Sequence, residues 1–205
     1  MDFSFLLRGL AIGFSIAAPV GPIGVLCIRR TLAEGRLAGL LSGLGAASAD
    51  AVYGFIAGFG LTYVSNMLVG YQSWIRLVGG LFLCCLGVLT FLSRPAESPA
   101  RTQGEGLLWD YASTFVLTLT NPMTIISFAA VFAGLGIGSA TGDYRSATLL
   151  VLGVFGGSAA WWLILSGGVS LLRSRFNRQA LVWVNKGAGV IISLFGVLAL
   201  LSLKP

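Results

Sequence analysis

Long apolar stretches separated by short polar clusters run the length of this 205-residue chain. A membrane-spanning helix needs about 20 mainly apolar residues, and six segments of the sequence meet that length. They cover residues 3–28, 37–64, the stretch between the polar residues 71–73 and Arg94, and residues 107–137, 147–172 and 180–203. The pattern predicts an all-α integral membrane protein with six transmembrane helices.

The composition agrees with a lipid environment. Hydrophobic residues make up 56% of the chain and charged residues only 10%, against roughly 25% charged in an ordinary globular protein. The formal net charge is +6, but the basic residues lie at the ends of apolar segments and form no stripe or patch. Nucleic acid is therefore not expected as a partner, whereas membrane lipid is.

The distribution of arginine predicts the orientation, because short cytoplasmic loops collect Lys and Arg. Arginine gathers in the first, third and fifth connections, at Arg29, Arg30, Arg36, Arg94, Arg101, Arg173, Arg175 and Arg178. The second connection has no basic residue, and the fourth has only Arg145 beside Asp143. The odd-numbered loops are thus predicted to face the cytoplasm of a bacterial inner membrane, with both termini outside the cytoplasm.

The polar stretch 94–106, which contains Pro95, Pro99 and both charge signs, is a natural midpoint linker. It divides the chain into residues 1–93 and 107–205, each with three predicted segments. Because three is odd, the two halves must have opposite orientations. The sequence therefore predicts two inverted three-helix repeats, although chance similarity between Gly-rich helices is the alternative.

The first segment of each half contains a proline-centred interruption. In one half it is Pro19-Val20-Gly21-Pro22, and in the other it is Asn121-Pro122 preceded by Thr120. Proline removes a helical hydrogen bond, and paired interrupted segments at matching places indicate a transporter's binding site. The alternative is a simple packing kink, since Pro and Gly are common in membrane helices.

Polar groups around the second interruption could line a hydrated vestibule. Pro122 should free the carbonyl of Thr118, and the side chains of Thr118, Thr120, Asn121 and Thr124 lie close along the chain. In hydrocarbon such groups must find partners or line a wet cavity. We therefore expect Thr120, Asn121 and Pro122 to belong to the same substrate site as Pro19, Gly21 and Pro22.

Asp50 lies near the middle of the second segment, where a carboxylate costs about 2.5–3.5 kcal/mol on insertion scales. At 100° per residue it shares a face with small residues, and the opposite face is large and apolar. Asp50 should therefore point into the bundle, where removal from water disfavours its charged form. It could carry a coupling proton, pair with a substrate ammonium, or make a structural hydrogen bond.

The remaining polar residues suggest little further chemistry. The chain has no histidine, and its cysteines, Cys27, Cys84 and Cys85, lie in apolar segments, so we predict no metal site, no cofactor and no catalytic residue. Arg8 and Arg76 are expected at the membrane interface, near the outer ends of their helices. Four-residue glycine spacings such as Gly9–Gly13 and Gly153–Gly157 indicate close helix packing, either within one chain or in a homodimer.

The motifs resemble those of the lysine exporter (LysE) family of amino-acid efflux proteins. The resemblance covers nearly the whole chain, and it rests on the motifs Ala18-Pro19-Val20-Gly21-Pro22, Arg29-Arg30-Thr31-Leu32, Gly35-Arg36, Ala49-Asp50-Ala51 and Leu119-Thr120-Asn121-Pro122. It implies six helices in two inverted halves, export of amino acids or related small cations, and coupling to protons. Many members have Asn where this chain has Ile23 and Lys where it has Met123, which leaves the substrate open.

Sequence alone thus favours a secondary-active exporter of an amino acid or a related small zwitterion or cation, and not an enzyme. An inorganic-cation exporter is a weaker hypothesis, because it would need several oxygen ligands and Asp50 is the only acid expected deep inside a helix. Three more hypotheses stay open at this point: a non-amino-acid metabolite exporter, a membrane oxidoreductase that uses Cys84 and Cys85, and a non-transporting scaffold.

Overall fold

The computed structural model describes residues 3–19, 21–59, 71–92, 106–121, 123–128, 144–172, 174 and 178–203. Within these ranges the regular secondary structure is helical, without strands. The main helices are α1 (Ser4–Ala17), α2 (Pro22–Glu34), α3 (Arg36–Gly58), α5 (Gln72–Leu92), α6 (Leu107–Leu119), α8 (Tyr144–Leu172) and α9 (Arg178–Leu201). A short helical stretch at residues 123–128 follows α6.

Three helices are each long and apolar enough to cross a membrane: α3, α8 and residues Gln179–Leu201 of α9. The pair α1 and α2 also qualifies as one span, although the two helices are bent by 80° at their junction. Residues Arg76–Leu92 of α5 and the whole of α6 form shorter apolar helices. The described residues therefore contain three such spans, or four with the bent pair, and the chain is a multi-pass membrane protein.

The first predicted segment, residues 3–28, differs from the structure in two ways. It is divided into α1 and α2, and α2 runs on to Glu34. The helix ends where Gly35 adopts a positive φ of 114° and its N–H donates to the carbonyls of Arg30 and Thr31. The prediction that Arg30 belongs to a loop is wrong, because this residue lies inside α2 and is only 3% exposed.

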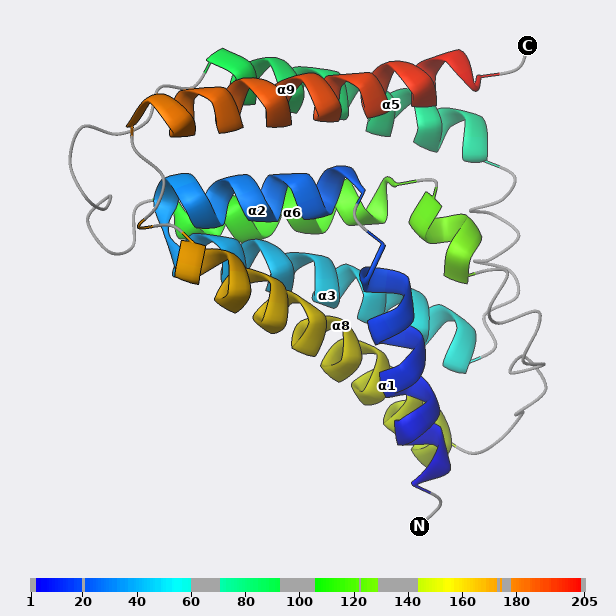
Figure 1. The fold of residues 1–205 in the computed structure, drawn as a ribbon. Coiled ribbons are helices and arrows are strands. Elements are labelled where there is room, and N and C mark those ends of the chain that lie inside the picture. Colours follow the sequence, from blue (N-terminus) through cyan, green and yellow to red (C-terminus); the bar gives the residue numbers. More distant parts are fainter. Residues whose placement is uncertain are drawn as a thin grey trace.

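The helices form layers (Figure 1). α5 and α9 pack side by side at the top of the view, α2 and α6 lie in the middle, and α3 and α8 lie below them. α1 turns away from α2 and packs along α8. The core between these layers is built from buried apolar side chains of all three layers, such as Leu26 of α2, Trp162 of α8 and Ile192 of α9.

Glycine allows close contact between α1 and α8. A Cβ on Gly13 would collide with the backbone of Val154, and one on Gly157 would collide with that of Leu10. Gly9 and Gly153 face each other in the same seam. These small-residue pairs therefore pack helices of the same chain against each other. This is one of the two roles predicted from their spacing, the other being a homodimer contact.

The helix ends next to the three arginine-bearing connections lie on one side of the molecule. The C-terminal ends of α2, α5 and α8 and the N-terminal ends of α3, α6 and α9 are on the left of Figure 1. The N-terminal end of α1 and the C-terminal end of α9 lie toward the right. With these helix ends together, the three odd-numbered loops can face the same side of a membrane, as the predicted orientation requires.

Candidate functional site

A cavity of about 580 Å³ lies where the two proline interruptions meet, within the roughly 300–1,000 Å³ typical of small-molecule sites. Eight helical segments contribute to its wall, from α1 through to α9. Among the lining residues are five that the sequence predicts for the substrate site: Pro19, Gly21, Pro22, Asp50 and Asn121. The fold thus brings together residues that are up to about half the chain apart.

At the first interruption the helix axis turns by 80°. α1 ends with the N–H of Ala18 donating to the carbonyl of Phe14, and Gly21 is extended, with φ −102° and ψ −162°. α2 then begins at Pro22, whose missing N–H costs nothing at the first position of a helix. The N–H of Val25 donates to the carbonyl of Gly21 over 3.0 Å, which closes the first turn of α2.

The second interruption supplies partners for the groups that it releases. Asn121 accepts a hydrogen bond from the N–H of Met123 through its side-chain oxygen, at 3.1 Å, and so caps the short helix at 123–128. The carbonyl of Thr118, predicted to be free, accepts the N–H of Asn121 at 3.2 Å. The hydroxyl of Tyr53 donates to the carbonyl of Leu119 at 2.6 Å. The break is therefore largely satisfied from within the protein.

The threonines of this region divide into two groups. Thr118 and Thr124 line the cavity, as does Met123. Thr120 is not among the lining residues, and its hydroxyl donates back to the carbonyl of Val116 at 2.9 Å. Pro122, the remaining predicted site residue, lies outside the residues that the structure describes.

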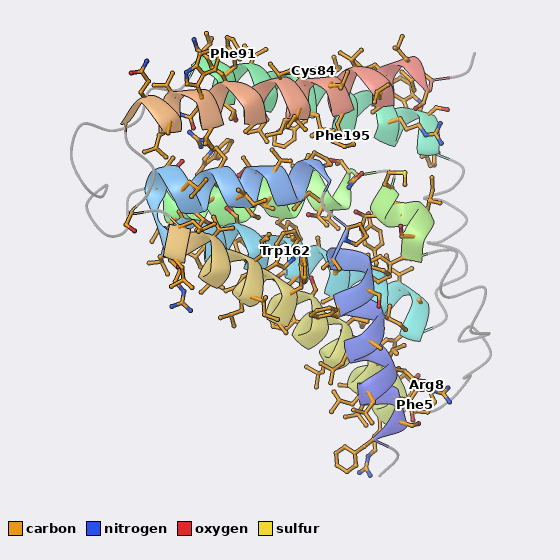
Figure 2. The ribbon with its side chains drawn as sticks, in the orientation of Figure 1. Phe5, Arg8, Cys84, Phe91, Trp162 and Phe195 are labelled. Carbon is orange, nitrogen blue, oxygen red and sulfur yellow. The ribbon has the colours of Figure 1, made fainter. Side chains whose placement is uncertain are left out.

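Asp50 is 3% exposed and lines the cavity from α3. The hydroxyl of Ser158 in α8 donates to its carboxylate at 2.7 Å, and the indole Nε1 of Trp162 donates to the Ser158 oxygen at 3.1 Å. Figure 2 shows Trp162 in the interior of the bundle. The inward position predicted from helical periodicity is confirmed, and no ion pair engages Asp50 among the described residues.

Gly43 makes room for this arrangement on α3. A Cβ at Gly43 would collide with the side chain of Trp162. The small-residue face predicted around Asp50 is thus the surface against which the tryptophan packs, and it allows the indole to reach Ser158. The hydrogen-bonded row Trp162, Ser158, Asp50 fixes the carboxylate at the cavity wall.

Arg76 of α5 also lines the cavity, and its interfacial assignment from the sequence missed this. Its Nη1 donates to the carbonyl of Ser202, beyond the end of α9, at 2.9 Å. Its Nε is buried and has no hydrogen-bond partner among the described residues. The signal was present in the helical spacing, because Arg76 shares a face of α5 with the buried residues Gly80 and Leu83.

Asp110, in the first turn of α6, is a second buried acid, which the sequence analysis did not single out. Nε of Arg30 lies 3.1 Å from Oδ1 of Asp110, and both side chains are 3% exposed. The guanidinium also donates to Ser42 of α3 at 2.8 Å and to the hydroxyls of Ser113 and Thr114 at 2.8 and 2.9 Å. This group, here called the Arg30 cluster, ties α2 and α3 to α6.

Comparison with known proteins places the chain among the translocators. The family model described as "LysE type translocator" matches residues 14–203. The chain belongs to the LysE family. It is therefore a membrane transport protein, and its family indicates a transporter rather than an enzyme.

Two curated relatives extend the comparison. The chain is 25% identical over 198 residues to a Bacillus subtilis (strain 168) protein named "Putative amino acid efflux protein YcgF", covering 94% of this chain and 93% of that one. It is 29% identical over 187 residues to the Escherichia coli (strain K12) protein named "Uncharacterized membrane protein YahN", covering 83% and 77%. No solved structure matches the chain.

Proposed function

We propose that this protein is a secondary-active exporter of an amino acid or a related small zwitterion or cation, driven by the proton gradient. The observation that carries the proposal is the cavity in which both proline interruptions meet the buried carboxylate of Asp50. Membership of the LysE family and the amino-acid efflux name of the Bacillus relative support the same function.

We further propose six membrane crossings in two inverted repeats, residues 1–93 and 107–205, joined by a cytoplasmic linker at 94–106. Such a repeat pairs the first helix of each half with the second helix of the other. The packing of α1 against α8 and of α6 against α3 fits that rule. The pairs α5 with α9 and α3 with α8 join corresponding helices of the two halves, which a two-fold relation between the halves also allows. With the arginine-bearing loops in the cytoplasm, both termini lie outside the cytoplasm of a bacterial inner membrane.

In the proposed mechanism, Asp50 is the group for which a proton and the solute compete. A carboxylate with one hydrogen bond, from Ser158, retains acceptor positions toward the cavity for a substrate ammonium. When a proton occupies the carboxyl group, the attraction for that ammonium is lost. Protons entering from outside would thus release the solute outward, which is antiport.

The Arg30 cluster lies about eight residues along α2 from the cavity end at Pro22, roughly 12 Å at 1.5 Å per residue. It joins helices of both proposed repeats on the side of the arginine-bearing loops. We propose that it holds this side closed while the cavity is reached from the other side.

Cells challenged with a panel of amino acids and their toxic analogues test the function. Growth and intracellular content are compared for wild type, Asp50→Asn and empty vector, with membrane levels of both proteins checked by immunoblot. The proposal predicts that wild type alone lowers the internal pool of at least one compound. Equal pools in all three strains across a broad panel would refute amino-acid export.

A further inference from the structure

Two opposite charges face one cavity in this protein. Asp50 contributes a carboxylate from α3, and Arg76 contributes a guanidinium from the first turns of α5. They are not partners of each other: Asp50 accepts from Ser158, and Arg76 donates to the carbonyl of Ser202. Among the described lining residues they are the two ionisable side chains, so the cavity presents one site for a cation and one for an anion.

The guanidinium of Arg76 is only partly used. Nη1 is bound to the carbonyl of Ser202, which anchors the side chain against the end of α9. Nε is buried and lacks a hydrogen-bond partner within the described part of the chain. A buried donor without an acceptor is unfavourable. A small movement of the side chain toward the cavity would present the edge formed by Nε and Nη2, which binds carboxylates through two parallel hydrogen bonds.

We propose that Arg76 binds the carboxylate of the exported solute and thereby selects amino acids over amines. The inference rests on the proposed function and adds a binding residue to it. Asp50 would receive the ammonium group, so the two protein charges match the two charges of a zwitterion. A solute without a carboxylate would leave Arg76 with its buried Nε still unpaired.

The rest of the cavity wall defines the side chain of this solute. It is mostly apolar, with Ile16, Ile23, Leu83, Met123, Trp162 and Phe195 among the lining residues. Phe195 extends from α9 toward the middle layer of helices (Figure 2). A second ammonium, as in lysine, would find no further carboxylate among the described lining residues. The apolar wall thus favours a neutral amino acid with an apolar side chain as the substrate.

The test is equilibrium binding to the purified full-length protein in detergent, measured by calorimetry with leucine, leucinamide and lysine. Leucinamide keeps the ammonium and the side chain of leucine but replaces its carboxylate by a neutral amide. The variants are Arg76→Gln, Arg76→Lys and the control Arg8→Gln. Arg8 is exposed on α1, over the ring of Phe5. Figure 2 shows it near the N-terminal end of α1, far from Trp162 and Phe195 of the cavity wall.

Wild type and Arg8→Gln should bind leucine about tenfold to a hundredfold more tightly than leucinamide, the range expected for charge-assisted hydrogen bonds. Arg76→Gln should bind leucine as weakly as leucinamide, and Arg76→Lys should recover part of the difference. Lysine should bind wild type more weakly than leucine. A merely structural Arg76 would lower the affinity for both leucine and leucinamide without changing their ratio.

Equal binding of leucine and leucinamide by wild type would overturn the role of Arg76 without the use of any variant. An unchanged ratio in Arg76→Gln would overturn it also, while leaving amino-acid export intact. Tighter binding of lysine than of leucine would refute the substrate class. If wild type binds no amino acid of a wider panel, the proposed function itself fails together with this inference.

Discussion

Replacing Asp110 by asparagine should leave the buried guanidinium of Arg30 without its counter-charge. The two side chains are each 3% exposed, and Nε of Arg30 lies 3.1 Å from Oδ1 of Asp110. Asparagine has nearly the same size as aspartate, so the change removes charge and little packing. The variant therefore isolates the electrostatic contribution of the pair to stability.

The expected loss follows from the burial of the pair. Removing one partner of a buried ion pair costs about 3–5 kcal/mol. Arg30 keeps its hydrogen bonds to Ser42, Ser113 and Thr114, which places the loss near the lower end, about 3 kcal/mol. For chains of this length 1 kcal/mol corresponds to roughly 2–4 °C, so the midpoint of thermal unfolding should fall by roughly 6–12 °C.

Thermal unfolding of the purified protein in detergent, followed by tryptophan fluorescence, measures the shift. The control is Glu34→Gln, which removes the ion pair of Glu34 with Arg29, whose side chains are 18% and 13% exposed. That more accessible pair should contribute about 1 kcal/mol or less. The double variant Arg30→Met with Asp110→Leu should recover most of the stability lost in Asp110→Asn, because apolar replacements leave no buried charge.

Two results would refute this account of the cluster. One is an Asp110→Asn variant as stable as wild type. The other is a double variant no more stable than the single one, which would mean that the packing and hydroxyl contacts, and not the charge, determine the stability of this region.

Three further predictions concern the surroundings of the cavity. Gly43→Ala should lower the unfolding midpoint and the rate of export, because its methyl group collides with the tryptophan packed on it. Gly168→Ala, with open space around its Cβ position within a helix, should lower neither; equal losses in the two variants would contradict the packing. Ser158→Ala removes the hydrogen bond to the buried carboxylate and should slow initial efflux by about tenfold at unchanged protein level, and wild-type efflux would count against a role for that bond. Cys84→Ala with Cys85→Ala should export like wild type in the same efflux assay, since redox chemistry has no part in the proposal; lost export that a reductant also abolishes in wild type would favour an oxidoreductase.

Much of the arrangement could be predicted from the sequence because membrane helices carry strong local signals. The inward position of Asp50 followed from a 3.6-residue period, since the small residues of its face define the buried side of α3. The meeting of Pro19, Pro22 and Asn121 at one cavity followed from the matching positions of the two interruptions. Both predictions rest on local sequence patterns, and a bundle of membrane helices allows few arrangements that satisfy them.

The wrong prediction for Arg30 concerns a partner that is distant in the chain. An arginine at the end of an apolar segment normally faces water, which is why the pattern predicts a loop position for Arg30; its partner Asp110 is 80 residues away. The sequence likewise does not show that Arg76, predicted at the membrane interface, also borders the cavity and donates to the carbonyl of Ser202, which is distant in the chain. Helical periodicity states which face of a helix is buried, but it does not state which charged side chain of another helix lies against it.

The central claim is best tested by transport into proteoliposomes that contain the purified protein and have an acidic interior. If the protein exchanges protons for an amino acid, wild type should accumulate labelled leucine above its external concentration, and a protonophore should abolish the accumulation. Asp50→Asn, reconstituted to the same level, should show no proton-driven accumulation. Accumulation by Asp50→Asn equal to that of wild type would contradict the role of this carboxylate in coupling.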